Sequence, residues 1–259
     1  MAGSIRLTID HISKAFPVGK NETLKVIDDL SFDVADNEFL VLLGPGHCGK
    51  SVTLNITAGL EKADAGMVRL DGEIIDRPSP KMGMVFQKVG IFPWLTVLEN
   101  VELGPRFKGE HKAERRKRAE KFIRIVGLQG FESSYPAQLS GGMKQRVGIA
   151  RAYTNQPEIL IMDEPFGALD AQTRYSMEEE VARIWSQEKR TIIFVTNNIE
   201  EAVYLGDRII LLTECPAKVK EIYHVDIPRP RDMMSPEFLA LRQKISDNTD
   251  FSIEREAEA

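Results

Sequence analysis

A glycine-rich segment directly after an apolar run carries the clearest chemistry in the sequence. Residues 39–43 predict a strand, and the chain from Lys50 to about Leu60 predicts a helix. Between them, and extending into the helix, lie Gly44, Pro45, Gly46, His47, Cys48, Gly49, Lys50, Ser51 and Val52. Strand, G-x-x-x-x-G-K-S and helix is the order of a phosphate-binding loop, in which backbone N–H groups and the helix dipole face one anion. In such a loop Lys50 contacts the β- and γ-phosphates, and the Ser51 hydroxyl ligates Mg²⁺.

Two carboxylates at the end of a second apolar run indicate related chemistry. Asp163 and Glu164 follow the apolar residues 159–162, and paired carboxylates there are costly unless a cation or a polar site faces them. Beside a phosphate loop, the first carboxylate holds Mg²⁺ and the second polarises an attacking water. The alternative is a strand that ends in solvent with two charged residues, but the phosphate loop favours the metal and water roles.

A second glycine-rich turn contains Ser140, Gly141 and Gly142 and leads into a predicted helix that ends near Ala152. Its N–H groups lie at the positive end of a helix dipole and predict a second phosphate site. The alternative is an ordinary helix start capped by Ser140. Since one nucleotide seldom needs two glycine-rich cradles from the same subunit, we expect this turn to serve a nucleotide bound by another copy.

Alternating strands and helices must position these residues. Buried strands are predicted at 82–86, 159–162, 191–195 and 208–212, with helices at 171–187 and 199–205. Half-buried strands at 5–9 and 26–34, a hairpin turn at 71–72, helices at 95–103 and 112–126, two strands after Leu212 and a helix from Pro236 complete the prediction. The alternation predicts a right-handed α/β fold around the phosphate loop.

An aromatic residue near the start of the chain is a candidate for contact with a base. Phe16 lies in a predicted loop rich in Pro and Gly between the first two strands. An aromatic ring near a nucleotide site offers a face on which a base stacks. From residue type and position alone, a role as a core anchor is equally open.

The composition excludes several classes of function. The 259 residues are 42% hydrophobic and 28% charged, which is typical of a globular protein, and the formal net charge of -5 excludes a surface that is basic throughout. No apolar run approaches the roughly 18–20 residues of a membrane span. Cys48 lies inside the phosphate loop, which argues against a structural disulfide with Cys215 and for a reducing compartment.

The order of these motifs resembles the ATP-binding cassette (ABC) subunit of transporters. The resemblance rests on the phosphate loop, Gln87, LSGGMKQR at 139–146, ILIMDEP at 159–165, GALD at 167–170 and Val195-Thr196. It implies an α/β fold with a P-loop NTPase (RecA-like) core, an N-terminal antiparallel β-subdomain and a helical insert. Residues 1–259 would form one nucleotide-binding domain, with the catalytic core at 1–87 and 156–259 and the helical subdomain at 88–155.

The resemblance also implies roles for individual residues. Phe16 stacks on adenine, Gln87 links the γ-phosphate, Mg²⁺ and the helical insert, and Asp170 helps communication across a dimer. In this family two subunits form a head-to-tail dimer with two ATP molecules between them. Ser140 and Gly142 of one subunit face the phosphate loop and the carboxylates of the other.

Residues 86–101, 227–232 and 235–242 are similar to bacterial import ATPases of the nitrate, sulfonate and taurine group. The implied cofactors are ATP and Mg²⁺. The implied partners are a second ABC ATPase subunit in a homo- or heterodimer, two transmembrane permease subunits and, indirectly, an extracytoplasmic solute-binding protein. The implied location is peripheral, at the cytoplasmic face of a bacterial membrane, with no nucleic-acid partner.

Three residues depart from the family pattern. His47 replaces a glycine, so a positive φ there would strain the backbone by roughly 1–3 kcal/mol; alternatively, a protonated His47 adds a cation to the site. Val52 lacks the hydroxyl of the usual Thr, which removes a hydrogen bond worth about 1.5–3 kcal/mol at most. Asn197 replaces the switch histidine of the family. An amide donates a hydrogen bond but, unlike an imidazole, does not take up a proton.

Two functions follow from this pattern. The leading hypothesis is an ATPase, with Glu164, Gln87 and Asn197 at its catalytic centre, that energises a bacterial importer for a small anionic solute. The second is a partly degenerate nucleotide-binding subunit that gates a heterodimer with a more active homologue. A cassette protein of DNA repair or translation is disfavoured, because the chain has one cassette and no basic arms. Because of the three departures, we expect MgATP binding with slow hydrolysis in the chain's own site.

Overall fold

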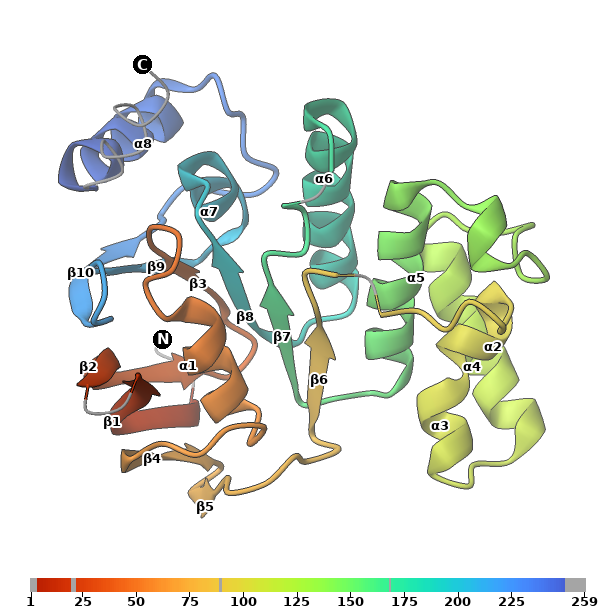
Figure 1. Cartoon of the computed structure of the whole chain (residues 1–259). Helices are drawn as coiled ribbons and strands as arrows, with labels where there is room; N and C mark the ends of the chain where they lie inside the picture. The colour runs from red at the N-terminus through yellow and green to blue at the C-terminus, as the bar shows by residue number, and fades with distance from the viewer. Residues whose placement is uncertain (1–3, 20–21, 89, 168, 250–259) are drawn as a thin grey trace. The chain divides into compact units, whose positions relative to one another are not determined.

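The computed structural model describes residues 4–19, 22–88, 90–167 and 169–249 (Figure 1). The chain separates into two compact units, the first formed by Met1–Ser79 and Thr191–Ala259 and the second by Pro80–Arg190. Residues 254–259, which the sequence suggests are acidic and frayed, lie outside the described residues. None of the helices in the described part of the chain combines the length and the apolar character that crossing a membrane requires.

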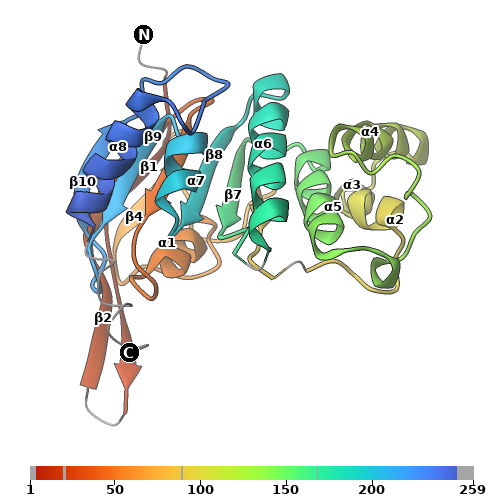
Figure 2. The same cartoon turned by 90° about the horizontal axis from the view of Figure 1, so that it is seen from above.

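An antiparallel sheet occupies one part of the first unit, with the strand order β2-β1-β4-β5. Its strands are β1 (Ile5–Val18), β2 (Glu22–Ala35), β4 (Ala65–Leu70) and β5 (Glu73–Ile74). The two long strands β1 and β2 run side by side (Figure 2). The hairpin prediction is confirmed, since Asp71 and Gly72 have φ of 50° and 81° between paired strands β4 and β5, as a two-residue type I′ turn requires.

The predicted Pro/Gly loop around Phe16 is wrong. Strand β1 continues through Phe16 and Pro17, which pair with Leu24 and Thr23 of β2. Pairing with β4 ends earlier, at Ser13, so β1 has a neighbour on one side only where the proline occurs. A proline is tolerated in such a stretch, because one side of the strand forms no ladder of hydrogen bonds.

The second sheet segment of the first unit is mainly parallel. In the order β10-β9-β3-β8, it contains β3 (Phe39–Leu43), β8 (Thr191–Thr196), β9 (Arg208–Leu212) and β10 (Val219–His224). Strand β3 pairs in parallel with β8 and β9, and β10 is antiparallel to β9. Strand β3 is buried along its whole length, as expected for the centre of a parallel sheet. The helices of this unit are α1 (Lys50–Thr57), α7 (Ile199–Leu205) and α8 (Pro236–Asn248).

The prediction of two strands after Leu212 is wrong, because the described residues there form one strand, β10. Thr213 closes a turn instead: its hydroxyl donates to the carbonyl of Pro216 at 2.8 Å and accepts from the N–H of Lys218 at 3.0 Å. Ala217 forms a single bridge to Ile27 of β2.

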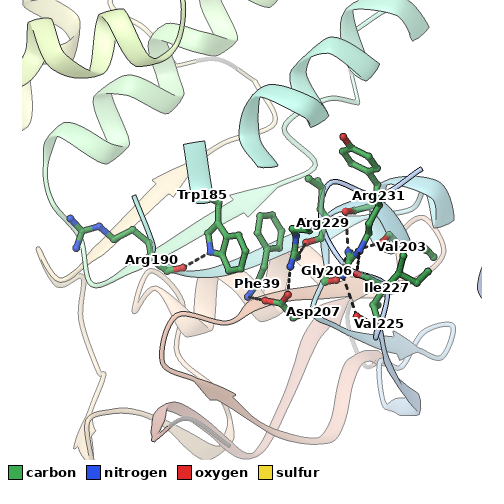
Figure 3. Close-up of polar contacts among 12 residues, drawn as sticks. Phe39, Trp185, Arg190, Val203, Gly206, Asp207, Val225, Ile227, Arg229 and Arg231 are labelled. Atoms are coloured by element: carbon green, nitrogen blue, oxygen red, sulfur yellow. Dashed lines mark hydrogen bonds and ion pairs between the residues drawn. The ribbon is translucent and has the colours of Figure 1, made fainter. Parts of the chain in front are cut away.

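A buried arginine fastens the segment after β10 to the end of α7 (Figure 3). The Arg231 guanidinium donates to the carbonyls of Val203, Tyr204 and Gly206 at 2.8, 3.0 and 2.6 Å, and also to those of Val225 and Ile227. Burial lowers the pKa of Arg231 to about 10, which leaves it charged at neutral pH. The otherwise unpaired carbonyls at the carboxyl end of α7 are thereby satisfied.

The second unit combines two parallel strands with five helices in its described part. Its elements are β6 (Met82–Val85), α2 (Val97–Val101), α3 (Leu103–Phe107), α4 (Lys112–Ile125), α5 (Gly141–Thr154), β7 (Ile159–Asp163) and α6 (Ala171–Gln187), with a short 3₁₀ turn at Pro136–Gln138. The one helix predicted at 95–103 is two short helices, of which α2 begins with a capping box between Thr96 and Glu99. Helices α4 and α5 pack through Phe122 and Tyr153, whose ring centroids are 5.7 Å apart. The predicted α/β fold is confirmed.

Candidate nucleotide-binding site

The glycine-rich loop begins where β3 ends. Leu43, the last residue of β3, pairs with Thr196, the last residue of the parallel strand β8, and the N–H of Gly44 donates to the Thr196 carbonyl at 3.4 Å. The loop and Asn197 therefore leave the same edge of the sheet, beyond its carboxyl ends. This is the edge where open α/β sheets bind ligands.

Two residues of the loop have left-handed backbone geometry. Gly49 has a φ of 98°, and a Cβ at this position would lie 2.8 Å from the Val26 carbonyl oxygen, so only glycine fits. His47 has a φ of 59° and an exposed side chain. His47 therefore has the positive φ that strains the backbone of a non-glycine residue.

The lysine of the loop is buried and lies against the loop itself. The Lys50 side chain is 4% exposed, and its ammonium donates to the carbonyls of Gly44 at 2.9 Å and Pro45 at 2.6 Å. Ser51 is exposed at the first turn of α1. Val52 is half-buried, and the hydroxyl that it lacks is not replaced by Thr53, which donates within the helix to the Gly49 carbonyl at 3.0 Å.

Cys48 supports the loop from the inside. It is 1% exposed, and its sulfur lies 2.9 Å from where a Cβ on Gly44 would be. Burial raises the pKa of the Cys48 thiol, which keeps it protonated and unreactive. Cys48 and Cys215 are both free thiols, in agreement with the expectation that they form no disulfide.

The turn that carries Asn197 is fixed by its two neighbours, Thr196 and Asn198, of which the sequence analysis named only Thr196. The buried Thr196 hydroxyl donates to the Glu201 carboxylate at 2.6 Å and accepts from the N–H of Asn198 at 2.9 Å. The Asn198 side chain caps α7 by accepting from the N–H groups of Glu200 and Glu201. An Asn followed by two Glu residues is a helix-start signal that could have revealed this cap. Asn197 is exposed.

Phe16 is half-buried on β1 and does not belong to the buried core. The alternative role as a core anchor is therefore not supported. A partly exposed ring on the edge region of β1 is available for stacking.

In the second unit, the paired carboxylates follow a parallel strand as predicted. Asp163 is the last residue of β7, and Glu164 follows with a φ of 39°. Both side chains are half-buried. A left-handed conformation at a non-glycine residue stores strain, which is often found at functional positions.

Gln87 lies close to the loop after these carboxylates. Strands β6 and β7 are parallel, with Val85 paired to Met162, so Gln87 and Asp163 leave the same edge. The Gln87 amide nitrogen lies 3.7 Å from where a Cβ on Gly167 would be. The structure therefore brings Gln87 and the loop after Glu164 together.

The second glycine-rich turn starts α5. The Ser140 hydroxyl accepts from the N–H of Met143 at 3.2 Å, which is the helix cap that the alternative interpretation predicts. Gly142 is buried, and a Cβ there would lie 2.7 Å from the Thr173 methyl group, whereas Gly141 is exposed. An open hollow of about 310 Å³ beside the turn is lined in part by Ser140, Gly142 and Thr173. The turn is thus both a helix cap and accessible to another molecule.

Asp170 is the N-cap of α6, a role that the sequence analysis missed. Its carboxylate accepts from the N–H of Thr173 at 3.0 Å, and this hydrogen bond lowers the pKa of Asp170. An Asp directly before a long amphipathic helix is the signal that could have shown it.

The oxygen donors predicted for Mg²⁺ are divided between the two units, with Ser51 in the first and Gln87 and Asp163 in the second. Within the described ranges, no group of three His, Cys, Asp and Glu side chains could hold a metal ion on its own. Ser51, Gln87 and Asp163 offer the hard oxygen donors that Mg²⁺ prefers. Since Mg²⁺ is commonly bound through one or two protein oxygens plus substrate phosphates, these donors are chemically suited to it, and the magnesium site stays a prediction.

Comparison with known proteins identifies the family. The family model described as ABC transporter matches residues 27–167. An uncharacterized ABC transporter ATP-binding protein of Methanocaldococcus jannaschii is 49% identical over 241 residues, covering 93% of this chain and 90% of the relative. An aliphatic sulfonates import ATP-binding protein of Bacillus cereus is 42% identical, and a taurine import ATP-binding protein of Rhizobium johnstonii is 41% identical. For both, 92% of this chain and 94% of the relative are covered.

Solved structures of similar fold agree with this family assignment. A dimeric bacterial ABC transporter cassette superposes with a TM-score of 0.74 at 33% identity, covering 85% of this chain and 98% of that chain. The post-hydrolysis state of that cassette, bound to ADP and phosphate, also gives a TM-score of 0.74, at 32% identity and the same coverage. The chain therefore belongs to the ABC transporter family, has the P-loop NTPase fold and is an ATPase coupled to transport.

Proposed function

We propose that this chain is the ATP-hydrolysing subunit of a bacterial importer for a small anionic solute of the sulfonate, taurine or nitrate kind. The observation that carries the ATPase part is the loop after β3, in which Gly49 is left-handed and Lys50 is held at the loop carbonyls. The solute class is supported by the relatives named for sulfonate and taurine import at 42% and 41% identity. In this proposal the site that binds and selects the solute lies in other subunits, and this chain does not contact the solute.

We assign the phosphate and metal contacts as follows. The N–H groups of residues 46–51 and the Lys50 ammonium bind the β- and γ-phosphates. Ser51, Gln87 and Asp163 hold Mg²⁺, which when bound neutralises phosphate charge during hydrolysis. Glu164 polarises the attacking water, and the Asn197 amide donates a hydrogen bond to the γ-phosphate.

Other contacts involve the base and a second subunit. The Phe16 ring stacks on adenine. The turn at Ser140–Gly142 binds the nucleotide of a second subunit in a head-to-tail dimer, and Asp170 takes part in communication between the subunits. The dimeric cassette among the similar structures supports this arrangement. The catalytic core comprises residues 1–87 and 156–259, and the helical subdomain comprises residues 88–155.

The partners follow from the same proposal. Two permease subunits cross the membrane, the ATPase dimer binds them at the cytoplasmic face, and an extracytoplasmic binding protein delivers the solute. ATP joins the halves of the dimer. After hydrolysis the separated phosphates repel, and the halves part, which is a shift in population driven by different contacts to ATP and ADP.

A second candidate is a gating subunit that pairs with a more active ATPase. Asn197, His47 and Val52 support it, because each weakens a contact to phosphate or strains the loop. Glu164 argues against a site that lacks all hydrolysis.

Reconstitution of the purified complex tests both candidates. The complex with its permease subunits is placed in liposomes, and ATP hydrolysis is measured with binding protein loaded with taurine, an alkanesulfonate or nitrate. We expect one loaded form to stimulate hydrolysis, and Glu164→Gln to abolish it. Two copies of this chain per complex, counted by native mass spectrometry, support the energising ATPase; one copy beside a different ATPase supports the gating subunit. If none of the loaded forms of the binding protein stimulated hydrolysis, the proposed importer function would be refuted.

A further inference from the structure

The ammonium of Lys14, a residue of β1, is surrounded by oxygen acceptors. The Lys14 side chain is 11% exposed, and its ammonium lies 2.7 Å from the Lys62 carbonyl, 2.8 Å from a Glu61 carboxylate oxygen and 3.3 Å from an Asp64 carboxylate oxygen. An ammonium has three N–H donors, so each can be directed at one acceptor. This side chain is therefore fixed in one position.

The same ammonium lies over the ring of Phe16. The distance from the Lys14 nitrogen to the ring centroid is 5.2 Å, which is within the roughly 6 Å range of a cation–π interaction. The two residues are on the same face of β1, since they are two positions apart on a strand. The ring is only half-buried, so a cation on one side leaves the other side for a planar partner.

The backbone next to Phe16 is hydrogen-bonded to the same segment, residues 61–64, that holds the Lys14 ammonium. The N–H of Ala15 donates to the Asp64 carboxylate at 2.7 Å, and the N–H of Asp64 donates to the Ser13 carbonyl at 2.8 Å. Asp64 lies a few residues after α1, the helix that begins with Lys50 in the phosphate loop. The backbone beside Phe16 is thus hydrogen-bonded to the segment that follows α1.

We propose that Lys14 is a positioning residue for the adenine base: it fixes the Phe16 ring and occupies one of its faces, so that the base stacks on the other. This proposal rests on the stacking role proposed for Phe16. A ring that is already fixed loses less conformational entropy when the base binds, which increases affinity. The Glu61 hydrogen bond raises the pKa of Lys14, and the Ala15 N–H lowers that of Asp64, so both keep their charges at neutral pH.

Binding measurements with two ligands separate the base from the phosphates. The dissociation constants of the full chain for ATP and for inorganic triphosphate, each with Mg²⁺, are measured by titration calorimetry. Lys14→Met keeps the length of the side chain and removes the charge, and we expect ATP to bind about three- to tenfold more weakly while triphosphate binds as before. Lys14→Arg, which restores a cation, should recover ATP affinity. Lys218→Met, which removes a lysine paired with Asp28 in the same unit, is the matched control and should change neither constant.

The outcomes distinguish the proposal from the role of Phe16. If Phe16→Ala weakens ATP but not triphosphate, while Lys14→Met binds ATP like the wild type, the positioning role is wrong and the stacking role stands. If Phe16→Ala leaves ATP binding unchanged, the stacking role fails, and the positioning role fails with it. Equal weakening of both ligands by Lys14→Met would also overturn the proposal. Should Lys14→Met not fold, Asp64→Asn, which removes the carboxylate charge but not Lys14, is expected to weaken ATP alone.

Discussion

The Thr196 hydroxyl donates a 2.6 Å hydrogen bond to the Glu201 carboxylate, and both side chains are almost completely buried, 2% and 5% exposed. On the other side of the turn, the Asn198 side chain caps α7. The residue between these anchors, Asn197, is exposed on a turn that is held from both sides. Its side chain can therefore be exchanged while the turn is kept.

Replacing Asn197 with His should raise ATP hydrolysis by the assembled complex by about tenfold or more, because an imidazole accepts and donates protons, whereas an amide does not. Phosphate release measures the effect, and Asn197→Gln, which keeps an amide, should give no gain. Unchanged turnover in Asn197→His, with the wild type already at about 1 s⁻¹ or faster, would contradict the view that this site is slowed.

His47→Gly should stabilise the chain. The left-handed φ of 59° costs a non-glycine residue about 1–2 kcal/mol, and the greater freedom of glycine in the unfolded chain offsets part of that. We expect a gain of about 0.5–1 kcal/mol in the free energy of unfolding, measured with urea. His111, exposed with a φ of −59°, supplies the control: His111→Gly relieves no strain and should give no gain. Equal gains at both positions would show that strain is not the cause.

Gly142→Ala should destabilise the chain, because the new Cβ would lie 2.7 Å from the Thr173 methyl group. Overpacking of this kind costs about 1–3 kcal/mol, measured as the free energy of unfolding. The neighbouring Gly141→Ala is the matched control, since its Cβ would meet its nearest atom, on Leu169, at 3.9 Å. The double variant Gly142→Ala/Thr173→Ser removes the methyl group and should recover most of the loss. If it does not, the clash is not the source of the cost.

The pH dependence of one surface pair follows from its geometry. A His11 ring nitrogen lies 2.7 Å from an Asp29 carboxylate oxygen, and this hydrogen bond raises the pKa of His11 above its usual 6.5. The pair therefore adds stability that is fully present below that value and is lost as the pH rises through the raised pKa. In Asp29→Asn, NMR titration should show the pKa of His11 falling back toward 6.5. An unchanged titration curve would mean that the pair does not form in solution.

Local patterns predicted the helices and strands that have strong signals of their own. Helices α6 and α7 and strand β9 have the predicted bounds, because their apolar residues follow the spacing of a helix or form a continuous run. The path of β1 through Pro17 was not predictable in the same way, since it depends on which side of the strand has a partner.

The motif residues of the site could also be named from the sequence, whereas their supports could not. Lys14 bonds to residues 48 and 50 positions away, and Arg231 bonds to carbonyls up to 28 positions away. Such contacts form only when the chain has folded, and no spacing of residues in the sequence predicts them. Positions such as Asn197 and His47 were identified as unusual, but the geometry that gives each its meaning comes from the structure.

The central claim is that the loop from Gly44 to Ser51 binds the phosphates of MgATP. Equilibrium dialysis of the purified chain against labelled ATP and Mg²⁺, with Lys50→Ala beside the wild type, tests it most directly. The account predicts saturable retention of ATP by the wild type and strongly reduced retention by the variant. A wild type that retains no ATP, or a variant that retains as much, would contradict it.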